Sequence, residues 1–337
     1  MTNLPPHFGS PRSSQSVGQS LAVIPTLTMG DIVSTGFRLY RSNFRTYFIL
    51  ALRATLWLLV PFLVLLGLGV VTGLLYDRFS SGMGVLMGIA VAIILLRLSM
   101  QSLIRAFLDM ALIIRLAYED FTHVEPTPPT AIGEIRQTLK PRGRRILLTF
   151  IFSFFLLFSL NLLLSVANVP LTNTFGLLFQ TWNGEWLAFL LANLITFSLY
   201  TWISARFFLV EVPIVIEENL SAFQSIGRSW SLAQGSILRI LIVMTIAFLV
   251  TIPLYSIASV PPIVGLVAAI PSFNLSDEAG QMALLTRFLP GVAIGLLLFL
   301  VMNMMVMGFW QSIKAVLYYD LRSRREGFDL RLSDRRE

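Results

Sequence analysis

The sequence predicts an all-α membrane protein, a polytopic bundle of six transmembrane helices. Hydrophobic residues make up 55% of the 337-residue chain and charged residues only 13%, which is too apolar for a soluble domain of this length. Six apolar runs reach the length of about 20 residues needed to cross about 30 Å of hydrocarbon as helices. They are continuous and do not alternate with period two, which favours helices over a β-barrel. The predicted spans are Tyr47–Leu75, Gly82–Leu108, Ile146–Val166, Trp186–Val210, Ile237–Ile257 and Leu289–Val316.

The basic residues separate onto two sides of these spans. They gather before the first span, in the second and fourth loops and after the sixth span, whereas the other three loops contain only Arg78 and Arg287. The positive-inside rule therefore predicts that both termini and the even-numbered loops are cytoplasmic. The expected location is the bacterial cytoplasmic (inner) membrane or another internal energy-transducing membrane. The net charge of +7 then points to anionic lipid headgroups as partners, and not to nucleic acid.

The N-terminal segment and the residue types that are absent limit the chemistry. Residues 1–27 are rich in Pro, Ser, Gly and Gln and are expected to form a disordered cytoplasmic arm. The segment shows no cleavable signal, so the first span would direct insertion. There is no cysteine, and the two histidines, His7 and His123, do not form a metal-binding or catalytic pattern. No metal or cofactor is predicted.

Each pair of spans is preceded by a short amphipathic segment that is expected to form an interfacial helix. Thr28 with Asp31, and Ser221 with Gln224, fit the capping box that begins a helix, and Thr130 can cap the helix between them. Apolar residues then follow at steps of three and four, as in an amphipathic helix. The three stripes are Val33, Phe37, Tyr40 and Phe44; Ile132, Ile135 and Leu139; and Phe223, Ile226 and Trp230.

The spacing of these helices indicates a threefold internal repeat. The units cover about residues 28–120, 129–219 and 220–320, and each consists of an interfacial helix and a transmembrane hairpin that ends in an acidic stretch. The alternative is that any protein built of hairpins with cytoplasmic loops shows this pattern. The predicted organisation is thus the arm, a membrane domain over residues 28–320 and a charged cytoplasmic tail over residues 321–337.

The interfacial helices carry basic residues opposite their aromatic face. Such helices can lie among lipid headgroups, where each basic residue contributes roughly 1 kcal/mol near an anionic surface. The alternative is that they only pack against the ends of the spans. The candidate headgroup contacts are Arg38, Arg41, Arg45 and Arg228.

Ionisable and amide side chains gather toward the cytoplasmic end of the returning spans. Four of them recur every four residues in the second span and so share one helical face. Such groups are costly in a membrane and mark either a ligand site or structural pairing. The structural alternative is intrahelical pairing of Arg105 with Asp109 and of Arg115 with Glu119. The candidate intramembrane site comprises Arg97, Gln101, Arg105, Asp109, Arg206, Glu211 and Lys314.

Two further segments carry predictions. Ser259–Phe273 is short and contains several prolines, so it is expected to be a separate re-entrant or interfacial piece. The tail is expected to lock the units together, because its arginines can pair with carboxylates at the ends of the earlier spans. The arginines are Arg322, Arg324 and Arg325, and the carboxylates are Glu119, Asp120, Glu217 and Glu218.

Three stretches resemble the bacterial membrane-domain family named after the integral membrane part of glycerophosphodiester phosphodiesterases. They are Gly36–Leu52, Ala205–Leu241 and Leu317–Leu330, and the resemblance covers most of residues 29–330. Phosphodiesterases of this kind carry a soluble barrel with a His-Arg-Gly start and acidic metal ligands, and this chain has neither that tripeptide nor the length for the barrel. The resemblance implies a membrane domain that stands alone, without a catalytic barrel.

No catalytic motif occurs in the structural context that it requires, so the chain is not expected to be an enzyme. The leading hypothesis is a non-catalytic membrane protein that binds lipids, or scaffolds a membrane protein partner, at the cytoplasmic face. The alternative is a transporter-like protein that uses the intramembrane polar residues for an anionic or lipid-like substrate.

Overall fold

The computed structural model describes residues 27–74, 82–122, 131–178, 184–270, 282 and 284–333. Within these residues, six helices are long and apolar enough to cross a membrane. The all-α class and the six predicted spans are therefore confirmed. The long helices are α2 (Phe44–Leu74), α3 (Gly82–Thr122), α5 (Gly143–Leu178), α6 (Gly184–Phe207), α9 (Ile237–Ala269) and α11 (Leu289–Ser333).

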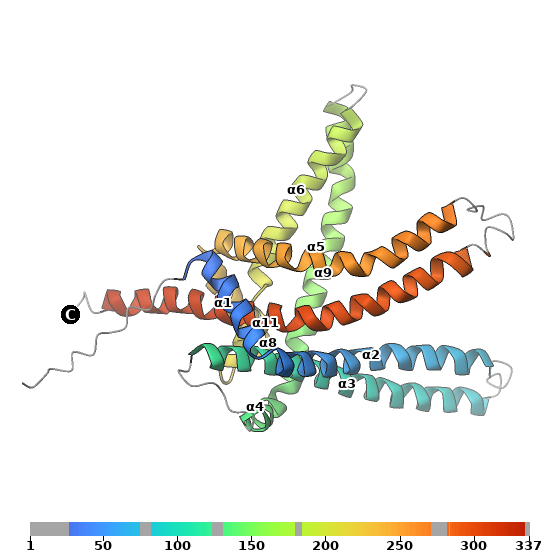
Figure 1. Ribbon diagram of the computed structural model, residues 1–337, viewed down its shortest axis with the longest axis horizontal. Helices are drawn as coiled ribbons and strands as arrows, with labels where there is room; N and C mark the ends of the chain where they lie inside the picture. The colour runs from blue at the N-terminus through green and yellow to red at the C-terminus, as the bar shows by residue number, and fades with distance from the viewer. Residues whose placement is uncertain are drawn as a thin grey trace, which may run out of the picture.

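The long helices form three hairpins, α2–α3, α5–α6 and α9–α11, which meet at one end (Figure 1). The stretches 106–117, 205–216 and 309–321 are largely buried there, and we call this region the hub. Beyond the hub the α5–α6 hairpin runs in a different direction from the other two. The outer parts of the hairpins expose large apolar side chains such as Phe62 and Phe154. This is the kind of surface that a hydrocarbon layer covers.

The three predicted amphipathic segments are helices that precede the hairpins. They are α1 (Met29–Ser42), α4 (Ala131–Leu139) and α8 (Ala222–Ala233). The capping boxes of Thr28 with Asp31 and of Ser221 with Gln224 are both present, so these two predictions are confirmed. A short 3₁₀ turn, Lys140–Arg142, joins α4 to α5. After α8 the chain turns at Gly235, whose φ of 81° lies in the left-handed region that favours glycine.

The fourth predicted span ends at a break in the helix, between α6 and the short helix α7 (Glu211–Ile216). Pro213 has no N–H group, and its ring would clash with the carbonyl of Leu209 in a continuous helix. Two carbonyl groups near the break, those of Arg206 and Val210, accept hydrogen bonds from serines of α8. Ser229 Oγ donates to Arg206 at 2.8 Å and Ser225 Oγ donates to Val210 at 2.5 Å. The break therefore provides the place where α8 docks.

The prediction for Ser259–Phe273 is wrong over the part of this segment that the structure describes. Helix α9 continues to Ala269, with Pro261 and Pro262 inside it. This stretch lies against α11, where a Cβ atom on Gly291 would be 2.6 Å from the carbonyl oxygen of Pro261. Prolines are tolerated inside membrane helices where neighbouring groups compensate for the backbone hydrogen bonds they remove. The close approach of α11 supplies such a neighbour.

The structure describes only part of each end of the chain. Residues 1–26, which form most of the predicted disordered arm, lie outside the described residues. Residues 321–333 of the predicted tail belong to α11, which continues as a helix to Ser333, and residues 334–337 lie outside the described residues. At about 1.5 Å per residue this helix is much longer than the hydrocarbon layer is thick. Its charged end therefore lies beyond the part that such a layer would cover.

Candidate functional site

A buried carboxylate on α3 holds arginines from two other helices. Asp109 has no exposed surface, and Arg53 on α2 donates to both of its oxygens, at 2.7 and 2.6 Å. Arg136 on α4 donates to the same carboxylate at 3.1 Å. The predicted pairing of Asp109 with Arg105 is therefore wrong: the partners of Asp109 come from the adjacent helices. This arrangement joins the first hairpin to the helix that begins the second unit.

Arg105 lies one turn away from this pair and contacts an aromatic ring. Its guanidinium carbon is 4.5 Å from the ring centre of Trp57 on α2. Trp57 follows Arg53 by four residues and Arg105 precedes Asp109 by four, so the two contacts are successive steps along an antiparallel helix pair. Such a cation–π contact fixes the orientation of the arginine without neutralising its charge.

Positive charge is in excess around Asp109. The one carboxylate pairs with Arg53 and Arg136, whose side chains are 37% and 41% exposed, and Arg105, one turn away, is exposed without an ion pair to it. Gln101 and Arg97 lie one and two turns before Arg105 on α3, and both are exposed. We call this surface the basic face and define it by Arg53, Arg97, Gln101, Arg105 and Arg136. Apart from the buried Asp109, the predicted polar line of α3 therefore lies on this surface.

The beginning of α5 crosses α3 at the same level. A Cβ atom on Gly143 would lie 3.0 Å from Ile104 and 3.2 Å from Leu108, so the two helices approach closely at this glycine. The next two residues, Arg144 and Arg145, are exposed. The start of α5 therefore adds further positive charge beside the basic face.

The other predicted intramembrane residues occupy two separate environments inside the hub. Lys314 on α11 donates a hydrogen bond to Glu211 on α7, and its side chain is only 17% exposed. Arg206 lies between two tryptophans, 4.3 Å from the ring centre of Trp202 and 4.2 Å from that of Trp230. The buried Lys314–Glu211 pair connects the second and third hairpins. It is a structural contact and is not part of the basic face.

The predicted headgroup contacts also divide into two groups. Arg38, Arg41 and Arg45 are exposed on α1 and at the start of α2. Arg228 on α8 instead forms ion pairs, with Glu217 at 3.1 Å and with Glu326 at the far end of α11. Its charge is thus neutralised within the protein, whereas the charges of the first three arginines face outward.

The charged end of α11 contacts earlier units through both acidic and basic side chains. Glu326 accepts from Arg228, and Asp320 lies 2.9 Å from Arg239 on α9, at an ion-pair distance without hydrogen-bond alignment. The described contacts of Arg322 and Arg324 with carboxylates are to Glu326 and Asp320 within their own helix. Within the tail, Glu326 pairs with Arg228 of α8 and Arg324 donates to the carbonyl of Leu27 at 3.0 Å, while the pairing of the tail arginines with carboxylates of the earlier spans stays a prediction.

Sequence reasoning missed two arginines that organise this end of the molecule, Arg53 and Arg239. Each is a cation inside a predicted span, Tyr47–Leu75 or Ile237–Ile257. A cation in a span is itself a signal of a partner or a function, so both were detectable.

Within the described ranges no cluster of three or more His, Cys, Asp or Glu residues could hold a metal ion. No family model, curated protein or solved structure gives a significant match to this chain.

Proposed function

We propose that this chain is a non-catalytic integral membrane protein that binds anionic lipid headgroups on the basic face. The observation that carries the proposal is the excess of guanidinium groups around one buried carboxylate. Arg53 and Arg136 are held by Asp109, and Arg105 is held by Trp57. All three remain partly exposed. The face thus presents fixed positive charge that the protein itself does not neutralise.

Guanidinium groups suit this task because they present several N–H donors in a planar fork that matches phosphate oxygens. A side chain that is already held in place loses less conformational entropy when a ligand binds. Asp109 and Trp57 hold the three arginines before any lipid arrives. The neighbouring Arg144 and Arg145 add long-range attraction for an anion.

The proposal places the hub at the cytoplasmic side of a bacterial inner membrane. Support comes from the basic residues, which gather at this end of the hairpins. The exposed Arg38, Arg41 and Arg45 would then lie at the level of the headgroups.

This orientation can be tested by cysteine labelling. Because the chain has no cysteine, single introduced cysteines report orientation without background. We expect Gln137→Cys to react with an impermeant maleimide only after the cells are opened, and Met282→Cys to react in intact cells.

The order of the helices also supports the proposed threefold repeat. A short helix precedes each hairpin in the same order, as α1 before α2–α3, α4 before α5–α6 and α8 before α9–α11. Superposition of the three units tests the repeat directly. A common path of the chain would support it, and three unrelated paths would refute it.

The lipid proposal is tested by lipid retention in native mass spectrometry of detergent-purified protein. Phosphatidylglycerol and phosphatidylcholine serve as probes. We expect Arg105→Gln to reduce the retention of phosphatidylglycerol about 10- to 150-fold, as for the loss of one charge-assisted hydrogen bond. Arg287→Gln is the matched control, because Arg287 is exposed in a different hairpin, where it donates to the carbonyl of Ala268.

Two outcomes would count against the proposal. Equal retention by the Arg105→Gln and Arg287→Gln variants would show that the basic face does not select anionic lipid. Flux of an anionic substrate through proteoliposomes that is lost in Lys314→Met, while this variant stays folded, would support the transporter alternative instead.

A further inference from the structure

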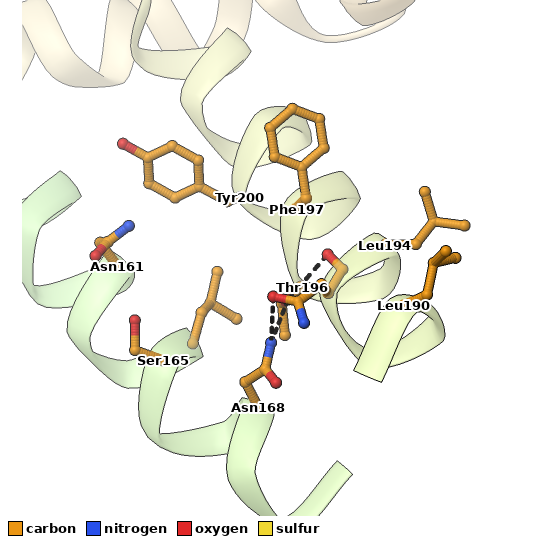
Figure 2. Close-up of a pocket in the computed structure, with 10 residues that line it drawn as sticks. Asn161, Ser165, Asn168, Leu190, Leu194, Thr196, Phe197 and Tyr200 are labelled. Carbon is orange, nitrogen blue, oxygen red and sulfur yellow. Dashed lines mark hydrogen bonds between the residues drawn. The ribbon is translucent and has the colours of Figure 1, made fainter. Parts of the chain in front are cut away.

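An uncharged cavity lies between α5 and α6, in the hairpin that points away from the other two (Figures 1 and 2). Its volume is about 510 Å³, within the range of roughly 300–1,000 Å³ that is usual for small-molecule sites. Six of its lining side chains are polar and the remainder are apolar. The polar ones are Asn161, Ser165, Asn168, Asn193, Thr196 and Tyr200.

Hydrogen bonds hold one wall of this cavity. Asn168 on α5 donates to Thr196 at 2.9 Å and to Asn193 at 3.3 Å, both on α6, and it accepts from Thr172 at 3.0 Å. Asn193 in turn donates to the carbonyl of Phe189 at 2.7 Å. These bonds join the two helices and fix the positions of the amides before any ligand binds.

Three other lining residues offer polar groups that the described part of the chain does not use. Asn161, Ser165 and Tyr200 have no hydrogen-bond partner among the described residues. Figure 2 shows Asn161 and Ser165 on α5 across the cavity from Tyr200 on α6. Asn193 is nine residues from the start of α6 at Gly184, about 14 Å along the helix, so the cavity lies well inside the apolar hairpin. Polar groups at such a depth gain from a partner, because the hydrocarbon offers none.

The chemistry of the lining selects an uncharged ligand. Among the described residues, no acid or base lines the cavity apart from the phenol of Tyr200, so a charged ligand would lose its hydration without gaining a countercharge. Amide and hydroxyl groups supply both donors and acceptors, which suits a ligand hydroxyl or ester. Leu164, Leu190 and Leu194 supply an apolar surface for an attached chain.

The surroundings favour a lipid over a second transmembrane helix as the occupant. Helix contacts in membranes use stripes of small residues that let the backbones approach. Here the exposed positions on α5 beside the cavity are large and apolar, including Leu162, Leu163, Val166 and Val169. Such positions are typical of contact with acyl chains.

We infer that the cavity between α5 and α6 binds an uncharged, hydroxyl-bearing lipid of the diacylglycerol class. The hydroxyl and ester groups lie against Asn161, Ser165 and Tyr200, and the acyl chains lie along the leucines. This site is separate from the basic face and has different ligand chemistry, so it goes beyond the proposed function.

The test uses the full-length protein in nanodiscs with photoactivatable diacylglycerol, and photoactivatable phosphatidylglycerol as the charged comparison. We expect diacylglycerol to label peptides from α5 and α6 in preference to phosphatidylglycerol. Asn161→Leu should reduce this labelling about 2- to 10-fold, the range that one hydrogen bond represents. This change is suitable because Asn161 is exposed and has no described partner to lose.

Asn173→Leu is the matched control, since Asn173 is exposed on the same helix but does not line the cavity. Equal labelling of the two variants, or equal labelling by the two lipids, would overturn the inference. Cross-linking of the cavity residues of α5 and α6 mainly to another copy of the chain would also overturn the inference, in favour of a helix-docking surface. Arg105→Gln should leave diacylglycerol labelling unchanged. The proposal of a diacylglycerol site and the proposal of anionic-lipid binding on the basic face can therefore fail independently.

Discussion

Lys314 on α11 donates a hydrogen bond to Glu211 on α7, and this pair joins two hairpins inside the hub. The ammonium group also lies 5.2 Å from the ring centre of Phe208. Burial of two charges is costly, and it is tolerated because each charge provides a partner for the other. Loss of one partner should therefore be worse than loss of both.

We expect Lys314→Met to lower the free energy of unfolding by about 3–5 kcal/mol, because it leaves Glu211 buried without a countercharge. The double variant Lys314→Met/Glu211→Leu should recover most of this loss. Thermal unfolding in detergent measures both. If the double variant is as unstable as the single one, burial of an unpaired charge is not the cause of the loss.

The docking of α8 on the break after α6 leads to a second prediction. Ser225 is fully buried, and its hydroxyl supplies a donor to the carbonyl of Val210. Ser225→Ala should therefore destabilise the protein by about 1–3 kcal/mol, the usual cost of an unsatisfied buried acceptor. Ser231→Ala is the control, because Ser231 donates to Arg228 within its own helix and is not fully buried. Similar midpoints for the two variants would argue against a specific role of the break.

Features that depend on neighbouring residues could be predicted from the sequence, whereas contacts between helices could not. The spans and the capping boxes depend on neighbouring residues in the chain, so they could be predicted. The partner of Asp109 could not, because Arg53 and Arg136 reach it from other helices and the packing between helices is not a local property. For the same reason the sequence did not predict the direct pairing of Glu211 with Lys314 or the separate environment of Arg206 between two tryptophans.

The cap of α1 leads to a pH-dependent prediction. Hydrogen bonds from the Thr28 side chain and backbone lower the pKa of Asp31 below its ordinary value. A carboxylate whose pKa is lower in the folded state stabilises that state above the pKa of the unfolded chain. This contribution is lost as the pH falls through the lower, folded-state pKa. Asp31→Ala should therefore lower the thermal midpoint near pH 7, and the difference from the unchanged protein should shrink below about pH 4. A difference independent of pH would contradict the role of the charged cap.

The last prediction concerns the close contact between α1 and α11. Gly36 is buried on α1, and a Cβ atom there would lie 2.7 Å from Cγ1 and 3.1 Å from Cα of Ile313. Ile313 is itself fully buried, so it has little room to move away. Gly36→Ala should therefore push α1 away from the hub and cost about 1–3 kcal/mol, as overpacking usually does.

Gly30 provides the matched control for this change, because it lies on the same helix and a Cβ atom there would be no closer than 3.9 Å to its nearest neighbour, the Thr28 hydroxyl. Alanine has a higher helix propensity than glycine by about 1 kcal/mol in a helix interior, and somewhat less is expected near a helix end. Gly30→Ala should therefore leave the thermal midpoint unchanged or raise it, while Gly36→Ala lowers it. A rise in both variants would show that propensity outweighs packing and that α1 is not held tightly against Ile313.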